Sequence, residues 1–167
     1  MIDQNNIYKK IISLLDENKV EYKLFSHKEA LNYEELAEVQ KESGFIGTEM
    51  KCLVLKVDQK FIVYITLQGE RVDFNIIKEK LQINKVRLCS PEELYEYFGA
   101  KPGCAYPFGF DDQFYIYVDP KIYSQDWLLF SPIFPTSTVQ ARGEHLRRIF
   151  DNLKNKVQEV TDFNLKN

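Results

Sequence analysis

The chain has 167 residues, of which 44% are hydrophobic and 28% are charged, and this ordinary globular composition predicts a single domain over residues 1–167. No apolar run approaches the roughly 20 residues of a membrane span, and the first residues, MIDQNNIYKK, lack the apolar stretch of a signal peptide. We therefore expect a cytoplasmic protein without a membrane partner. The net charge of −3 argues against a protein that grips DNA or long RNA mainly through phosphates, but it permits one that grasps only an RNA end.

The first half of the chain alternates helix and strand patterns. Asp3 can cap a helix with an apolar stripe, and Asn32 with Glu35 forms a pair of the capping-box kind that starts another helix. Two aliphatic runs joined by a short polar turn predict a β-hairpin that is apolar on both faces and therefore covered on both. The elements expected here are helices over 4–18 and from Tyr33 to about Gly44, and strands over 21–25, 49–57 and 60–67.

The second half continues this alternation around an irregular loop. SPEE at 90–93 supplies a capping serine, a proline and a glutamate in the order of a strong helix start. KPGCAYPFG at 101–109 has two prolines and two glycines in nine residues and cannot be regular. The elements expected here are helices over 74–82, 91–99 and 144–157, and strands over 85–89, 113–119, 126–130 and 137–141. This order predicts the α+β class, with a central mixed, largely antiparallel sheet flanked by helices.

The strand MKCLVLKV (50–57) contains a lysine where its pattern predicts an apolar side chain. Side chains two positions apart share a face of a strand, so Lys51 lies on the same side as Leu53, Leu55 and Val57. An ammonium group buried without a partner costs several kcal/mol or loses its proton. Lys51 therefore either binds an anionic ligand at the end of the strand or packs its stem inward while its head reaches water.

The loop 101–109 has two readings as well. A constrained glycine-proline loop can direct backbone N–H groups at one point, and Gly103 permits close backbone approach. A tight connection between a helix and a strand is the alternative. Cys104 would need a base held close to act as a nucleophile, and neither His27 nor His145 is placed by the sequence for that role, so a small buried cysteine is favoured. The three cysteines and two histidines form no CxxC or HxxxH pair, and we expect no metal and no cofactor.

In their order and spacing these segments resemble the YbaK/prolyl-tRNA-synthetase-associated editing domain, the family of free-standing aminoacyl-tRNA deacylases. The resemblance covers about residues 20–153. The segments that carry it are the strand before His27, KCLVL (51–55), RVD (71–73), KVRLCSPEEL (85–94), GAKPGCAYPFG (99–109) and the strand ending in Val118-Asp119.

The resemblance implies an enzyme that hydrolyses the ester of a mischarged tRNA in trans, with proline tRNA carrying a small amino acid of the alanine, cysteine or serine class as the expected substrate. It implies no metal and no covalent nucleophile. Lys51 matches the functional lysine that helps to hold the 3′ end of the tRNA, and Gly103 matches the glycine that places a backbone group at the ester. Further substrate-binding residues are expected at His27, Ser131, Thr136 and Ser137.

The chain departs from the alanine-editing branch of that family, which carries a histidine-proline pair where Ser131 precedes Pro132 here. Amino-acid specificity cannot be taken over from that branch. The mild acidity of the chain favours contact with the acceptor end of the tRNA alone, together with a partner such as a tRNA synthetase. Two alternatives stay open: a non-catalytic module of the same fold that binds a tRNA end or a synthetase, and a hydrolase of small free esters that uses Cys104.

Overall fold

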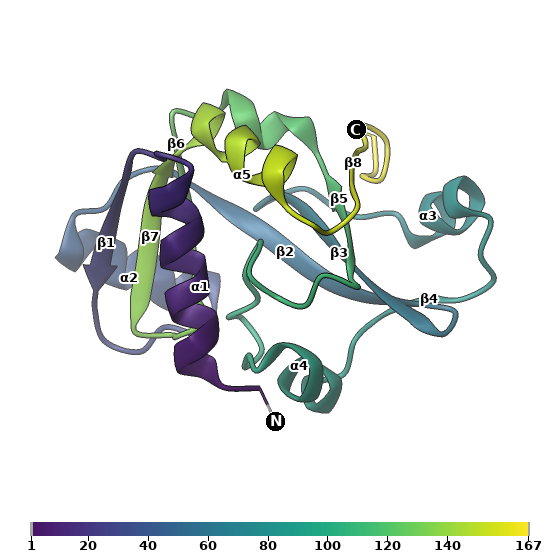
Figure 1. Ribbon diagram of the computed structural model, residues 1–167, viewed down its shortest axis with the longest axis horizontal. Coiled ribbons are helices and arrows are strands. Elements are labelled where there is room, and N and C mark those ends of the chain that lie inside the picture. Colours follow the sequence, from purple (N-terminus) through teal and green to yellow (C-terminus); the bar gives the residue numbers. More distant parts are fainter. Residues whose placement is uncertain (1, 167) are drawn as a thin grey trace.

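A mixed β-sheet organises the chain, and helices lie against it (Figure 1). The computed structural model describes residues 2–166. The strands are β1 (Tyr22–Ser26), β2 (Thr48–Val57), β3 (Lys60–Leu67), β4 (Val86–Leu88), β5 (Tyr115–Val118), β6 (Trp127–Phe130), β7 (Ser137–Arg142) and β8 (Val157–Glu159). The α-helices are α1 (Gln4–Glu17), α2 (Tyr33–Ser43), α3 (Phe74–Leu81), α4 (Pro91–Phe98) and α5 (Leu146–Asn152), and the 3-10 segments are η1 (Pro120–Ser124) and η2 (Gly143–His145). The predicted α+β class is confirmed.

The strands follow the order β1-β7-β6-β2-β3-β5-β8, and β4 pairs with β2 outside this row. Antiparallel pairs join β1 to β7, β7 to β6, and β2 to both β3 and β4. Parallel pairs join β2 to β6, β3 to β5, and β5 to β8. The sheet is therefore mixed, as predicted, with β2 and β3 at its centre.

Local capping residues determine where two helices beside the central strands begin and end. The Ser90 hydroxyl accepts a hydrogen bond from the Glu93 N–H at 3.1 Å, and the Glu93 carboxylate accepts one from the Ser90 N–H at 2.8 Å, which confirms the capping box of α4. Asn32 caps α2 by accepting from the Glu35 N–H at 2.8 Å. Gly44 ends α2 in the left-handed conformation, with φ at +80°. Asn32 therefore fixes where α2 begins, and Gly44 fixes where it ends.

The central hairpin is buried on both faces, as its apolar runs predicted. Val54 and Val63 belong to a large cluster on one face, together with residues of α1 and α4. Leu55 and Val57 belong to a smaller cluster on the other face, together with Ile77 of α3. Lys51 therefore shares its face with residues that are packed into the core.

The prediction of a helix over 144–157 is wrong in its second half. The helix ends at Asn152, and Val157 lies in strand β8, parallel to β5. Asn155, only 7% exposed, donates from Nδ2 to the carbonyls of Asp111 and Phe114 at 2.9 and 2.8 Å, which fixes the chain in a turn. Val157 continued the apolar spacing of the helix in the sequence. The edge of β5, with which β8 pairs, decides the outcome and lies far away along the chain.

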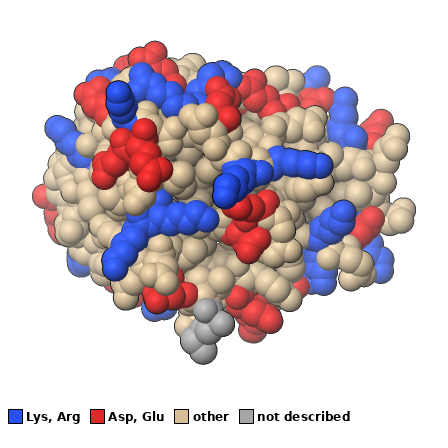
Figure 2. Space-filling model, viewed as in Figure 1, with Lys and Arg blue, Asp and Glu red and all other residues tan. Residues whose placement is uncertain are grey.

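The face of the molecule seen in Figure 2 carries positive and negative side chains next to one another. Ion pairs of opposite charges are found among the described residues, for example Arg147 with Glu159 and Lys121 with Glu70. A mixed surface of this kind does not attract a long polyanion by charge alone. None of the helices in residues 2–166 is long and apolar enough to cross a membrane.

Candidate functional site

Within residues 2–166, strand β2 lacks a neighbouring strand along part of one edge. On that edge it pairs with β6 at Thr48 and Glu49, and with β4 only from Leu55 onward, while β3 occupies the other edge. The carbonyl of Val54 points to the interrupted edge, because it accepts a hydrogen bond from the Cys89 N–H at 2.9 Å. Backbone groups alternate in direction along a strand, so the N–H and C=O of Cys52 point to this edge too. The interruption exposes main-chain donors and acceptors inside the sheet.

A pocket with a volume of about 350 Å³ lies at this interruption. Its lining combines β2, the start of α2 and the residues before it, the loop 101–109, the end of β6 and the start of β7. Mostly apolar walls with a few polar groups are typical of small-molecule sites. Polar side chains in this lining include those of Tyr33, Glu49, Lys51, Ser131, Ser137 and Thr138.

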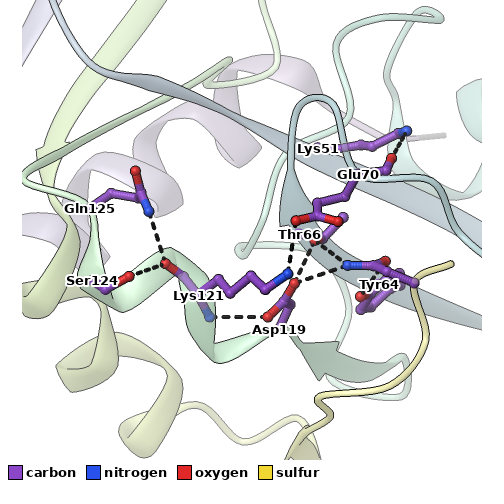
Figure 3. A network of polar contacts seen from close by, with 9 residues as sticks. Lys51, Tyr64, Thr66, Glu70, Asp119, Lys121, Ser124 and Gln125 are labelled. Carbon is purple, nitrogen blue, oxygen red and sulfur yellow. Dashed lines mark hydrogen bonds and ion pairs between the residues drawn. The ribbon is translucent and has the colours of Figure 1, made fainter. Parts of the chain in front are cut away.

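Lys51 lies in this lining with its charge available. Its Nζ donates a hydrogen bond to the backbone carbonyl of Glu70 at 2.8 Å (Figure 3). The Glu70 carboxylate is turned elsewhere and accepts from Lys121 Nζ at 2.9 Å. A neutral carbonyl orients the Lys51 ammonium without cancelling its charge, and an ammonium has three donors. Lys51 can therefore hold an anionic group that enters the pocket.

A buried polar network supports the strand behind Lys51. The cross-strand partner of Lys51 is Thr66, which is fully buried. The Thr66 hydroxyl donates to Asp119 at 2.8 Å, and Asn164 Nδ2 donates to that same carboxylate at 3.1 Å. Figure 3 shows Lys51, Thr66, Glu70 and Asp119 along this network. Such satisfied networks fix strand positions, so the network gives Lys51 a rigid base.

Gly103 also lines the pocket, where its loop packs against the segment before α2. Its φ is +87°, in the left-handed region that favours glycine. A Cβ atom at this position would overlap the carbonyl oxygen of Leu31. The close backbone approach predicted for Gly103 is therefore present, and it is made to the chain itself at the pocket wall.

His27 lies behind the pocket wall. Its Nδ1 contacts the Lys28 carbonyl at 2.7 Å, and only a protonated nitrogen can donate to that carbonyl. In the neutral ring Nε2 then accepts from the Thr138 hydroxyl at 2.8 Å. Thr138 does line the pocket, so His27 orients a pocket residue. Thr136 stands outside the lining, and its carbonyl accepts from the His27 N–H at 2.9 Å.

Ser131 and Ser137 both line the pocket, whereas Cys104 does not. The Ser131 hydroxyl donates to the Phe134 carbonyl at 3.3 Å. Cys104 is 1% exposed, and burial raises the pKa of its thiol to about 11. A thiol in that state is protonated at neutral pH and is a poor nucleophile.

Within residues 2–166, no three His, Cys, Asp or Glu side chains lie together as metal ligands would.

Glu49 is a pocket residue that the sequence analysis missed. It pairs with Leu129 of β6 at the start of β2, and its Oε1 is buried without a hydrogen-bond partner among the described residues. Burial raises the pKa of the Glu49 carboxyl to about 7. One signal was present in the sequence: Glu49 and Lys51 are two positions apart on a strand and so share a face.

We expect Glu49→Gln to stabilise the protein at pH 8 by roughly 2–3 kcal/mol, with the gain vanishing near pH 4.5. The carboxyl titrates near 4.5 in the unfolded chain and near 7 in the folded protein, so the folded state binds the proton more tightly. The wild type therefore loses stability as the pH rises from 4.5 to 7, whereas the amide does not titrate. Urea denaturation across this pH range measures the difference. Glu79→Gln, at an exposed site on α3, is the control, and equal curves for both variants would contradict the assignment.

Comparison with known proteins gives consistent relatives. Residues 27–149 match the family model of the aminoacyl-tRNA editing domain. The chain is 27% identical over 85 residues to the proline–tRNA ligase of Bacillus licheniformis, a match that covers 48% of this chain and 15% of the ligase. A hypothetical protein of known crystal structure superposes with a TM-score of 0.72 at 16% identity, covering 90% of this chain and 98% of that one. A candidate trans-editing enzyme for prolyl-tRNA synthetase superposes with a TM-score of 0.69 at 16% identity, covering 92% and 95%.

Proposed function

Because the chain belongs to the aminoacyl-tRNA editing domain family, whose model matches residues 27–149, we propose that it is a cytoplasmic deacylase that hydrolyses the ester of a mischarged tRNA in trans. The observation that carries this proposal is that Lys51 lines the pocket while its ammonium donates to a neutral carbonyl, that of Glu70, and to no carboxylate. The partial match to a proline–tRNA ligase favours proline tRNA as the substrate. The expected amino acid is a small one of the alanine, cysteine or serine class, which a pocket of about 350 Å³ can accommodate.

The proposed reaction needs little chemistry from side chains. Lys51 binds a phosphate of the terminal nucleotide, and the aminoacyl ester lies over the interrupted edge of β2. A water molecule attacks the ester carbonyl, the bond to the ribose oxygen breaks, and the ribose hydroxyl takes up a proton as the amino acid leaves. Backbone N–H groups of Cys52 and of the loop around Gly103 are the candidate donors to the oxyanion. An aminoacyl ester is already activated, so positioning and oxyanion stabilisation can supply the rate.

The test is deacylation of proline tRNA charged with alanine, cysteine, serine or threonine. Turnover of at least one species, with correctly charged prolyl-tRNA left intact, would support the proposal. Absence of turnover on all of them would favour the non-catalytic binding module. The acceptor end would be the main RNA contact, and the mildly acidic chain favours a synthetase as a partner for full recognition. Tight, salt-resistant binding of tRNA by the protein alone would contradict the need for that partner.

A cysteine hydrolase is the rival mechanism, and one substitution separates it from the proposal. We expect Cys104→Ala to keep deacylation within about threefold of the wild type, because the thiol is buried, protonated and absent from the pocket lining. Rates under single-turnover conditions measure the effect. Loss of activity in a variant that still unfolds at the wild-type urea concentration would favour the thiol mechanism.

A further inference from the structure

The pocket lining contains two charged side chains of opposite sign, Glu49 and Lys51. They share one face of β2 and lie two positions apart, which separates their Cα atoms by about 7 Å along the strand. The remaining lining residues, such as Tyr33, Cys52 and Thr138, are uncharged or apolar. The pocket therefore presents a carboxyl group and an ammonium group at two fixed points on the strand.

These two charges are held apart. Lys51 Nζ donates to the Glu70 carbonyl, while Glu49 Oε1 is buried without a partner among residues 2–166. Tyr33 and Cys52 lie close enough for the Glu49 charge to contribute to their raised pKa values, and burial is the larger cause for both. Each of these pKa values is raised to about 12, so both neighbours stay neutral and neither supplies a counter-charge.

An unpaired carboxylate in such a place costs free energy, so its retention at the pocket needs a reason. A cationic group entering from outside would supply the missing partner. The substrate of the proposed reaction carries one: every aminoacyl ester has an α-ammonium next to the ester carbonyl, and its nucleotide carries a phosphate. Its charges are thus opposite in sign to those that Glu49 and Lys51 present.

Resting on the proposed function, we propose that the carboxylate of Glu49 binds the α-ammonium group of the aminoacyl ester while Lys51 binds the phosphate. The ammonium is common to alanine, cysteine and serine, so Glu49 orients the ester without choosing among them. The ester carbonyl is then held between the two charged anchors, over the interrupted edge of β2. Esters that lack the free amine would leave the carboxylate buried and unpaired, and the pocket would reject them.

The experiment uses two non-hydrolysable probes that differ in one group. Both are 3′-amino-3′-deoxyadenosine 5′-monophosphate acylated on the 3′ nitrogen, one with alanine and one with lactic acid, which has a hydroxyl in place of the ammonium. Calorimetry at pH 7.5 should find that the wild type binds the alanyl probe about tenfold or more tightly than the lactyl probe. Glu49→Gln should bind both probes equally, and the exposed-site control Glu79→Gln should keep the preference. Lowering the pH to 5.5 should erase the preference in the wild type, because Glu49 then takes up a proton.

Equal affinity of the wild type for both probes, or no binding of either at millimolar concentration, would overturn the inference. A preference that persists in Glu49→Gln would also overturn it. If that variant loses turnover while keeping the preference, Glu49 acts as a general base instead. The binding assay needs no turnover. A wild type that prefers the alanyl probe but deacylates no tRNA would therefore contradict only the proposed function. Deacylation of tRNA together with equal affinity for the two probes would contradict only the role given to Glu49.

Discussion

Replacing Lys51 with alanine is expected to lower kcat/KM for deacylation by about 100-fold or more. Among the described residues that line the pocket, Lys51 alone carries a positive charge, and the contact of its ammonium with the Glu70 carbonyl fixes its direction. In the proposed reaction, loss of this ammonium would leave the phosphate of the terminal nucleotide without its anchor and misplace the ester relative to the backbone donors of β2. Single-turnover rates on the tRNA species that the wild type accepts give the comparison.

Lys60→Ala is the matched control for Lys51→Ala. Lys60 is exposed at the start of β3, outside the pocket, so its loss removes the same charge from the protein without touching the site. Similar activity of the two variants would mean that only net charge matters. Wild-type activity of Lys51→Ala would remove the observation on which the proposed function depends.

Gly103→Ala is expected to destabilise the protein by about 3 kcal/mol or more and to lower deacylation by at least about tenfold. Two penalties combine at this site. The backbone φ of +87° disfavours any side chain, and the new methyl group would overlap the Leu31 carbonyl. Relief of that overlap moves the loop away from the segment before α2 and so changes the pocket wall. Urea denaturation and single-turnover rates measure the two effects.

Gly44→Ala isolates the first of these penalties. Gly44 has a similar φ of +80°, but a Cβ atom there would meet nothing within 4 Å. Alanine at this site should cost only about 1 kcal/mol and leave deacylation unchanged. If the two variants lose the same stability, the contact with Leu31 has no energetic weight, and the role given to Gly103 in shaping the pocket is wrong.

Local signals in the sequence predicted most of the fold. Helices with strong caps, such as α4 after Ser90 and α2 after Asn32, begin where those residues stand, because a cap acts over a few neighbouring positions. Strand β8 was missed because its formation depends on the edge of β5 and on hydrogen bonds from Asn155 to distant carbonyls. Contacts of that kind leave no periodic trace in the segment itself.

The residues of the candidate site also differ in whether local sequence signals or long-range packing determine their place. Lys51 interrupts an apolar strand and Gly103 lies in an unusual glycine-proline loop, but these patterns left two interpretations open, and the family resemblance decided the prediction; both residues line the pocket. Glu49 was missed because an acidic residue at the start of a strand is ordinary until the burial of its carboxylate is known. His27 was predicted as a pocket residue, and the structure places it behind Thr138. Sequence gives residue chemistry, while the layer in which a side chain lies depends on tertiary packing.

Because the pairing of β2 is interrupted, the pocket has two kinds of surface: the main chain of β2 and side chains from other segments. In the proposed reaction the ester would lie over the main chain of β2, and peptide N–H groups keep their geometry whichever side chain the residue carries. The surrounding side chains, Ser131 and Ser137 among them, come from other segments and can be exchanged without disturbing the central hairpin. Under the proposed function, substitutions at these two serines would change which amino acid is accepted, while the backbone donors at the ester would stay the same.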